Sequence, residues 1–410
     1  MRPSRRSLRG LDWFAFFVAD VQTGFGPFVS VYLTSEKWTL IDIGLVLSVA
    51  SIVSLVGQVP AGRLLDAMRS ERLAAAVAVG LISTSAIAYA SWPVFPVVLA
   101  AACLHAAASC LLGPAIAAIS LGLVGPREVG ERFGRNARFQ SIGSGLSAAV
   151  MGAVGYFFEP RAVFLVTAAM LIPTWAALHF INPREIDPER AHGASPREPQ
   201  HNPPVSLRGL VTKPLIIFGC AILLFHLANA AMLPLMGNML TKRSSAEWAT
   251  VLIAACVIGP QLVVALCAPW AGRQAQRLGR RPILLVGLVA LPIRGVLFAT
   301  VTDPYLLVVI QLLDGITATV FNVMVPLTVA DLARGTGRFN LTLGLVGTMM
   351  GIGASISPTL AGYITDSFGS PTGFFTLAAI AFVGLVVVAL LMPETRPNEK
   401  EAPVNQDVRG

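Results

Sequence analysis

Two copies of one short pattern decide how this chain is expected to fold. The more complete copy reads Gly272-Arg-Gln-Ala-Gln276-Arg277-Leu-Gly279-Arg280-Arg281. The other copy reads Gly62-Arg-Leu-Leu-Asp66 and is followed by Arg69 and Arg72. Each copy lies at the end of a long apolar run, one over 40–65 and the other over 247–270. About 20 apolar residues are enough to cross a bilayer as one helix, so we expect a membrane protein in which one unit occurs twice.

Apolar runs of this kind extend over the whole chain. They predict twelve membrane-spanning helices, at 11–33, 40–65, 72–91, 94–122, 137–158, 163–181, 214–239, 247–270, 282–300, 304–329, 340–364 and 373–392. Only 13% of the 410 residues are charged, about half the roughly 25% of a soluble domain, which disfavours soluble enzymes, secreted modules and nucleic-acid binders. The runs are also too long and uniform for barrel strands. The predicted fold class is therefore an all-α membrane protein.

The basic residues predict the orientation of these helices. With the N-terminus placed inside, 25 of the 30 Lys and Arg residues fall on the inner side and four fall in outer loops. Cytoplasmic loops typically carry this excess. We therefore expect both termini in the cytoplasm and the chain in the cytoplasmic (inner) membrane. The basic N-terminus is interpreted as part of a retained first span, because no small-residue cleavage site follows the first apolar run.

A polar segment over 182–213 divides the spans into six and six. It is rich in proline and mixed charge and has no apolar periodicity, which predicts a disordered cytoplasmic linker. The expected organisation is an N-terminal six-helix bundle over 1–181, this linker, a C-terminal six-helix bundle over 214–392, and a cytoplasmic tail over 393–410.

The two halves resemble each other outside the opening pattern as well. Thr34 and Trp38 recur as Thr241 and Trp248, Gly155-Tyr156 recurs as Gly362-Tyr363, and Arg132-Phe133 recurs as Arg338-Phe339. Such a repeat indicates a duplicated six-helix unit. Pseudo-symmetric halves of membrane proteins commonly hold a binding site near the bilayer midplane, at the interface between them.

With six plus six spans, a cytoplasmic linker and two copies of the loop pattern Gly-x-x-x-Asp-Arg-x-Gly-Arg-Arg, the chain resembles the major facilitator superfamily (MFS) of secondary transporters over essentially its full length. The resemblance implies alternating access, with this loop latching the halves on the cytoplasmic side in the outward-open state. This chain departs from the pattern at Gln276, which replaces the acid, and in the first copy, which lacks the inner glycine. The candidate gate residues are Gly62, Asp66, Arg69, Arg72, Gly272, Gln276, Arg277, Gly279, Arg280 and Arg281.

Five ionisable residues lie inside predicted spans, where a charge costs at least a few kcal/mol and is a functional candidate by default. They are Asp20, His105, His226, Arg294 and Asp314. The resemblance implies that spans one, four, seven and ten line a central cavity, which would place four of the five there, with Gln22 and Asn229 beside them. We hypothesise that Asp20 with His105, and Asp314 with His226 or Arg294, form a proton-coupling and substrate-binding centre. The alternative is a static Asp314–Arg294 pair with histidines that only pack.

The expected function is secondary active transport of a small organic solute, proton-coupled, with efflux favoured over uptake. Drug exporters of the superfamily tend to carry an arginine in span four, where this chain has His105, so the direction stays open. A copper(I) importer is a weaker alternative, because Met232 and Met236 share a helix face near His226 but span eight lacks a His-x-x-x-Met motif.

Catalytic and nucleotide-binding motifs are missing from the sequence, so we expect no enzyme and no cofactor. The alternative from a different functional class is a membrane sensor or scaffold that no longer transports. Such a protein would be expected to lose its intramembrane charges. The expected partners are a small-molecule substrate, protons and the lipid bilayer, without nucleic acid, and the chain is expected to be a monomer.

Overall fold

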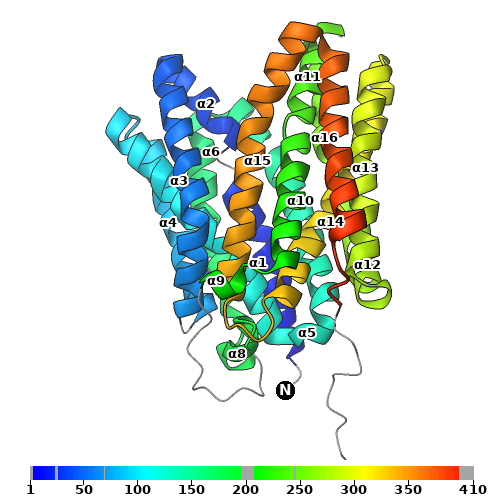
Figure 1. Ribbon diagram of the computed structural model, residues 1–410. Helices are drawn as coiled ribbons and strands as arrows, with labels where there is room; N and C mark the ends of the chain where they lie inside the picture. Colours follow the sequence, from blue (N-terminus) through cyan, green and yellow to red (C-terminus); the bar gives the residue numbers. More distant parts are fainter. Residues whose placement is uncertain (1–2, 24–25, 69, 195–206, 244–245, 397–410) are drawn as a thin grey trace, which may run out of the picture.

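The computed structural model describes residues 3–23, 26–68, 70–194, 207–243 and 246–396 (Figure 1), and these residues form helices and connecting segments without a strand. The N-terminal half consists of α1 (Arg5–Thr23), α2 (Gly26–Ser35), α3 (Leu40–Ala67), α4 (Glu71–Ser91), α5 (Phe95–Phe157), α6 (Pro160–Ala169) and α7 (Leu171–His179). Three short helices follow: a 3-10 turn (Pro183–Glu185), α8 (Pro188–Ala191) and α9 (Leu207–Leu210). The C-terminal half consists of α10 (Lys213–Asn229), α11 (Met232–Arg243), α12 (Ala246–Leu278), α13 (Arg280–Thr300), α14 (Pro304–Leu332), α15 (Phe339–Phe368) and α16 (Ser370–Leu391).

The twelve predicted spans are recovered. Ten helical stretches of the described chain are long and apolar enough to cross a membrane. One of them, Phe95–Gly155, holds two spans, because Gly125 takes the left-handed conformation (φ 72°) and breaks the helix in front of Pro126. The helices α1 and α2 together correspond to the first predicted span. The arginines at the start of α1 make it less apolar than the other spans. The fold is therefore the expected twelve-helix bundle in two halves.

One span begins well before its predicted boundary. Span five was expected over 137–158, but its helix starts at Pro126 and continues to Phe157. The predicted spans leave residues 123–136 between spans four and five, and residues 126–136 carry five charged residues. Their charges are accommodated inside the fold: Arg132 is only 3% exposed and pairs with the buried Asp12 of α1.

The prediction of disorder over 182–213 does not hold for its first part. Residues 182–194 form the 3-10 turn and α8, with Asn182 and Asp187 accepting hydrogen bonds from the backbone at the start of each. The segment folds because its few apolar residues are buried, Ile186 at 6% and Ala191 at 0% exposed. Residues 195–206 of the expected linker lie outside the described residues.

Each half has its own aromatic core between its helices. In the N-terminal half Phe164 stacks on Tyr89 and packs at a tilt against Tyr32, and the Tyr32 hydroxyl donates to the Tyr89 carbonyl at 3.0 Å. In the C-terminal half Phe298 of α13 packs against Phe374 of α16 with ring centroids 5.4 Å apart. The beginning of α1, the end of α16 and residues 182–194 lie at the same end of the bundle, the lower end in Figure 1, which we call the termini side.

Candidate functional site

A cavity of about 380 Å³ lies between the two halves. The N-terminal half contributes side chains from α3 and both parts of α5, and the C-terminal half contributes side chains from α10, α14 and α15. The lining residues are Gln58, Gly113, Pro114, Ile116, Ala117, Phe133, Asn136, Gln140, Phe225, His226, Asn229, Asp314, Ala318, Phe321, Asn322, Val325, Pro326, Leu343, Gly347 and Met350. Its volume is within the range of small-molecule sites, about 300–1,000 Å³.

The wall of this cavity combines carboxamides with phenyl rings. Five Asn and Gln side chains line it, three from the N-terminal half and two from the C-terminal half. From the C-terminal half, the rings of Phe225 and Phe321 also line the cavity and stack with centroids 3.7 Å apart. Carboxamides both donate and accept hydrogen bonds, and aromatic rings offer flat apolar surface. The lining therefore suits an organic molecule that has polar groups and an apolar face.

A charged pair, Asp314 with Arg294, lies at the cavity wall. The guanidinium of Arg294, on α13, donates to the Asp314 carboxylate and, through its other terminal nitrogen, to the Asn229 side-chain oxygen. The Arg294 side chain is 2% exposed, whereas that of Asp314 is 25% exposed and reaches the cavity. Arg294 thus lies behind the wall, and Asp314 and Asn229 form the surface in front of it. Of the two partners that the sequence left open for Asp314, Arg294 is the one in contact.

The methionines proposed for copper have other neighbours. The Arg294 guanidinium also lies 3.4 Å from the sulfur of Met232, and the sulfur of Met236 lies 4.0 Å from the Cys256 thiol. Both methionines are fully buried. A guanidinium beside one of the two sulfurs repels a second cation, so this geometry disfavours copper there.

The remaining candidates from the sequence are placed differently. His226 lines the cavity, its ring packs edge-on against Phe225, and its Nε2 has no hydrogen-bond partner among the described residues. His105 is not among the lining residues, and its Nε2 lies 3.4 Å from the Ser109 hydroxyl. Asp20 and Gln22 belong to α1, but their side chains lie outside the described residues.

A buried charge network in the N-terminal half was not among the predicted sites. Asp12 of α1 is 3% exposed and pairs with both Arg132 and Arg135 of α5. Arg132 Nε donates to the Asn136 oxygen at 2.8 Å, and Asn136 Nδ2 donates to Ser120 at 2.7 Å. Asn136 lines the cavity, so the network fixes which way its amide faces. The sequence feature that points to this network is an acidic residue, Asp12, inside an apolar run, together with arginines at the boundary of a predicted span.

The first copy of the opening pattern joins the two halves at the termini side. A Cβ at Gly62 would overlap the backbone carbonyl of Asn340, so α3 and α15 approach each other as closely as a glycine allows. One turn further on, Asp66 accepts the backbone N–H of Asn340 at 3.1 Å and that of Leu341 at 2.8 Å. A carboxylate at a helix N-terminus satisfies amides that have no partner within the helix. Asp66 thus caps α15 from the other half of the molecule.

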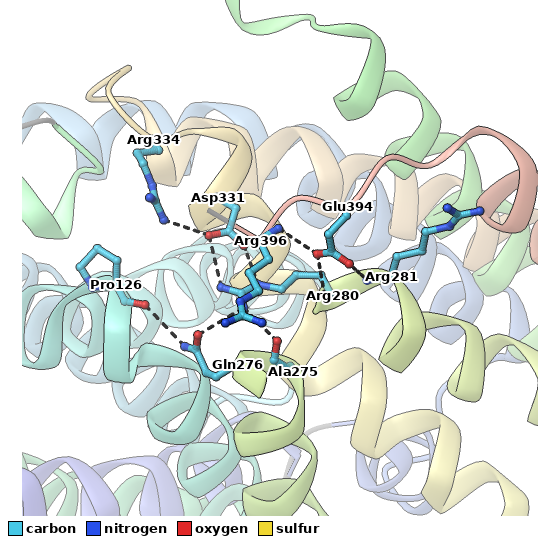
Figure 2. Close-up of polar contacts among 9 residues, drawn as sticks. All are labelled: Pro126, Ala275, Gln276, Arg280, Arg281, Asp331, Arg334, Glu394 and Arg396. Carbon is cyan, nitrogen blue, oxygen red and sulfur yellow. Dashed lines mark hydrogen bonds and ion pairs between the residues drawn. The ribbon is translucent and has the colours of Figure 1, made fainter. Parts of the chain in front are cut away.

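The second copy makes the corresponding contact between α12 and α5. A Cβ at Gly272 would overlap the carbonyl of Gly130. Gln276, which replaces the acid, donates its side-chain N–H to the Pro126 carbonyl at 3.5 Å (Figure 2). Where the first copy caps a helix with a charged carboxylate, the second copy makes a neutral hydrogen bond with a longer donor–acceptor distance.

Arg273 of the second copy pairs with Glu131 of the N-terminal half at 3.3 Å, whereas behind Gln276 Arg280 and the backbone of Arg281 bind carboxylates of their own half (Figure 2). Arg280 is 1% exposed, and its Nε donates to Asp331 at 2.7 Å, while Arg334 reaches the same carboxylate at 3.2 Å. Glu394, beyond α16, accepts the backbone N–H groups of Arg280 and Arg281 at 2.8 and 3.1 Å. Asp331 and Glu394 were not predicted, because their partners lie far away along the chain.

The other residues of the pattern have structural contacts near the gate. Arg72 donates to the Ile181 carbonyl at 2.8 Å, the Arg277 carbonyl accepts from Arg396 at 2.6 Å, and Arg281 donates to the Ala389 carbonyl. Gly279 has a φ of 106°, which favours glycine. Arg69 lies outside the described residues. Both copies therefore lie at contacts on the termini side, and the structure is closed at that end.

These features define the class of protein: a helical membrane protein whose two similar halves enclose a cavity and meet in a gate. A family model of the Major Facilitator Superfamily matches residues 13–259 and 223–409. The chain belongs to this family and is an MFS transporter, as its resemblance to the superfamily led us to expect.

Individual relatives agree with this assignment. An uncharacterised MFS-type transporter of Mycobacterium tuberculosis (strain H37Rv) is 38% identical over 410 residues, covering 98% of this chain and 95% of that protein. The class B tetracycline resistance protein of Escherichia coli is 31% identical over 136 residues, about a third of each chain. The crystal structure of the E. coli fucose:proton symporter has the same fold, with a TM-score of 0.74 at 13% identity over 92% of this chain and 97% of that chain.

Proposed function

We propose that this MFS transporter couples proton movement to the export of a small organic solute, with Asp314 as the proton-binding group at the cavity wall. The observation that carries the proposal is the pairing of Asp314 with Arg294, in which the carboxylate faces the cavity and the guanidinium is buried behind it. Buried charges in membrane spans are costly and are kept for function by default.

The geometry links the proton on Asp314 to the state of Arg294. While Asp314 is ionised, it neutralises the guanidinium, and the pair is stable as a unit. When Asp314 takes up a proton, Arg294 keeps Asn229, the sulfur of Met232 and the ring of Phe298 as neighbours but has no counterion among them, and an uncompensated buried charge costs several kcal/mol. Solvent access to the cavity changes when the halves rock, and this is how the proposal links proton binding at the pair to the transport cycle.

The solute is proposed to occupy the cavity next to this pair. Asn229 and His226 lie on the same helix, α10, and both line the cavity, so a bound solute contacts the ion pair and the histidine together. The stacked rings of Phe225 and Phe321 provide an apolar surface. Asp20, His105 and Gln22 remain proposals for the other half of the site.

The closed termini side is proposed to be the cytoplasmic gate. With the excess of Lys and Arg placed inside, this structure corresponds to a state whose cytoplasmic side is shut by Asp66 and Gln276. Both termini then lie in the cytoplasm, in a cytoplasmic membrane, and the chain acts as a monomer. Export is favoured over uptake because tetracycline resistance and multidrug resistance proteins are among the relatives, each over about a third of this chain.

Transport in liposomes tests this proposal with tetracycline as the first solute and a thermal-shift screen of metabolites to supply others. In Asp314→Asn protein, solute flux driven by a pH gradient should fall at least tenfold, while exchange of labelled for unlabelled solute without a gradient persists. The matched control is Asp303→Asn on the same helix, since Asp303 is exposed and only caps α14. Gradient-driven flux equal to the parent in Asp314→Asn would refute the coupling role, and the direction of flux distinguishes export from uptake.

A further inference from the structure

We infer that residues 182–194, which we call the strap, form a third component of the termini-side gate and hold it closed through His192. This inference rests on the proposed rocking of the two halves, since a strap across a gate matters only if the gate opens. A connecting segment needs only length and flexibility. The strap instead makes specific contacts with both halves, and its contact with the C-terminal half lies at the start of α15, which Asp66 also caps.

The strap is attached to the N-terminal half at three points. The backbone N–H of Asn182 donates to the Ser7 hydroxyl at 3.0 Å, and Glu185 accepts the backbone N–H of Ser4 at 2.8 Å. The backbone N–H of Asp187 donates to the Gly122 carbonyl at 3.2 Å, at the end of the first span of α5. The beginning of the strap therefore moves with the N-terminal half.

The end of the strap is attached to the C-terminal half. The carbonyl of Gly193 accepts the N–H of Gly335 at 2.7 Å, and the carbonyl of His192 accepts the N–H of Phe339 at 3.1 Å. Phe339 is the first residue of α15, and the next two amides, of Asn340 and Leu341, are those that Asp66 accepts. Three consecutive amides of α15 that lack a partner within the helix are thus satisfied by the strap and by α3 together.

The side chain of His192 links this contact to α4. Its Nε2 lies 3.0 Å from a carboxylate oxygen of Glu71, whose side chain is 3% exposed. Glu71 begins α4, four residues after α3 ends, and occupies the position of Arg281 in the second copy of the pattern. The strap therefore binds α4 with its side chain and α15 with its backbone at the same residue.

The charges around His192 favour its protonated form. Burial alone would lower the pKa of His192, but the nearby Glu71 carboxylate and the charge of Asp66 outweigh it, so that the pKa lies above its usual value of 6.5. Glu71 faces the imidazole from α4 and Asp66 acts on it from α3. On the side of the C-terminal half, Arg334 and Arg338 flank the two amides that the strap binds, and Glu189 and Arg190 belong to the strap itself.

When the termini side opens, α3 and α4 must move away from the start of α15. The strap is bound to α4 and also to the start of α15. Either its hydrogen bonds to Gly335 and Phe339 or its ion pair with Glu71 must therefore break when the termini side opens. A protonated His192 holds the gate closed more firmly than a neutral one, because only the cation pairs with Glu71. The pH on the termini side therefore sets how readily this gate opens.

Hydrogen exchange of the purified full-length protein, measured by mass spectrometry without any solute, tests the strap. In His192→Gln protein at pH 6, the amides in peptides covering 333–343 should exchange on the order of fivefold faster than in the parent. Glu71→Gln should have the same effect, and the double variant no more than either single one, because both substitutions remove one interaction. The matched control is Arg190→Gln, which removes a strap cation whose partner is Asp187, within the strap.

Raising the pH from 6 to 8.5, with correction for intrinsic exchange rates, should speed exchange over 333–343 in the parent and have no such effect in His192→Gln. If His192→Gln does not fold, as judged by Tm and gel filtration, the exchange rates of Glu71→Gln and of the parent across the pH series test the strap in its place. Unchanged exchange in 333–343 for Glu71→Gln and across the pH series would refute the strap. Because no transport is measured, this result is independent of whether the chain moves protons.

Discussion

Asp66 accepts the backbone N–H of Leu341 at 2.8 Å, across the boundary between the two halves of the molecule and over 275 positions of the chain. The contact places a carboxylate at the N-terminal end of α15, where unpaired amides and the helix dipole favour negative charge. It is also the point where the strap reaches the same helix. The termini-side gate therefore combines helix capping between the halves with the exposed ion pair of Arg273 and Glu131.

Replacing Asp66 by asparagine should weaken this gate. Asparagine keeps one acceptor oxygen but loses the charge and the second acceptor, which amounts to about 1–2 kcal/mol for a cap. Exchange of the Asn340 and Leu341 amides should rise about tenfold, as measured by mass spectrometry. Asp42→Asn, at the other end of α3, is the control, since Asp42 is only half-buried and its carboxylate accepts from the hydroxyl of Thr39, three residues earlier in the chain. Equal protection in Asp66→Asn and the parent would contradict the capping role.

A methyl group at Gly62 should be tolerated poorly. The added Cβ would meet the Asn340 backbone, which cannot move like a flexible side chain, and such overpacking costs about 1–3 kcal/mol. We expect Gly62→Ala to lower the Tm in detergent. Gly44→Ala, in the same helix, meets nothing within 4 Å and should leave the Tm unchanged or raise it, because alanine favours helices over glycine. The account fails here if the two variants shift the Tm alike.

Removing Arg294 should destabilise the protein more than removing both members of its pair. Arg294→Ala leaves Asp314 facing a cavity left by the guanidinium, and breaking a buried pair costs about 3–5 kcal/mol. The double variant Arg294→Ala with Asp314→Asn should recover part of the lost stability in thermal unfolding. For comparison, Arg161→Ala removes an exposed pair with Glu159, and such pairs contribute about 0–1 kcal/mol. A double variant less stable than Arg294→Ala alone would exclude the pairing as the source of the effect.

Substitutions in the network around Asp12 should destabilise the protein to different extents. Asp12→Asn leaves the buried Arg132 without its counterion, so we expect a large drop in Tm. Arg135→Gln should have a much smaller effect, because Arg135 is half exposed and Arg132 still compensates Asp12. Similar drops in Tm for both variants would mean that the burial of Arg132 does not determine how much stability is lost.

The contribution of His192 to stability should depend on pH in a defined direction. Its pKa is raised in the folded protein, so its pair with Glu71 contributes fully below pH 6.5 and is lost as the pH rises through the raised pKa. The difference in Tm between the parent and His192→Gln should therefore be largest at pH 6 and smallest at pH 9. A difference that grows with pH would contradict the assignment of the charge.

Much of this structure could be predicted from the sequence because the bilayer imposes long apolar helices. The twelve spans, the halves and the contact between Asp314 and one of its two candidate partners followed from helix length, repeat and intramembrane charge. What was missed depends on tertiary contacts. The charges of residues 126–136 indicate a loop until Asp12 compensates them, and the strap has too few apolar residues to predict order until Gly122, Glu71 and Phe339 bind it.

The claim that this MFS transporter is proton-coupled through Asp314 is tested most directly by proton movement itself. Purified protein is placed in liposomes that contain a pH-sensitive dye, and a solute found in the thermal-shift screen is added without an imposed gradient. The account predicts a pH change inside the liposomes that depends on the solute, is present in the parent and in Asp303→Asn, and is abolished in Asp314→Asn. Solute movement in the parent without any pH change, or an unchanged proton signal in Asp314→Asn, would contradict it.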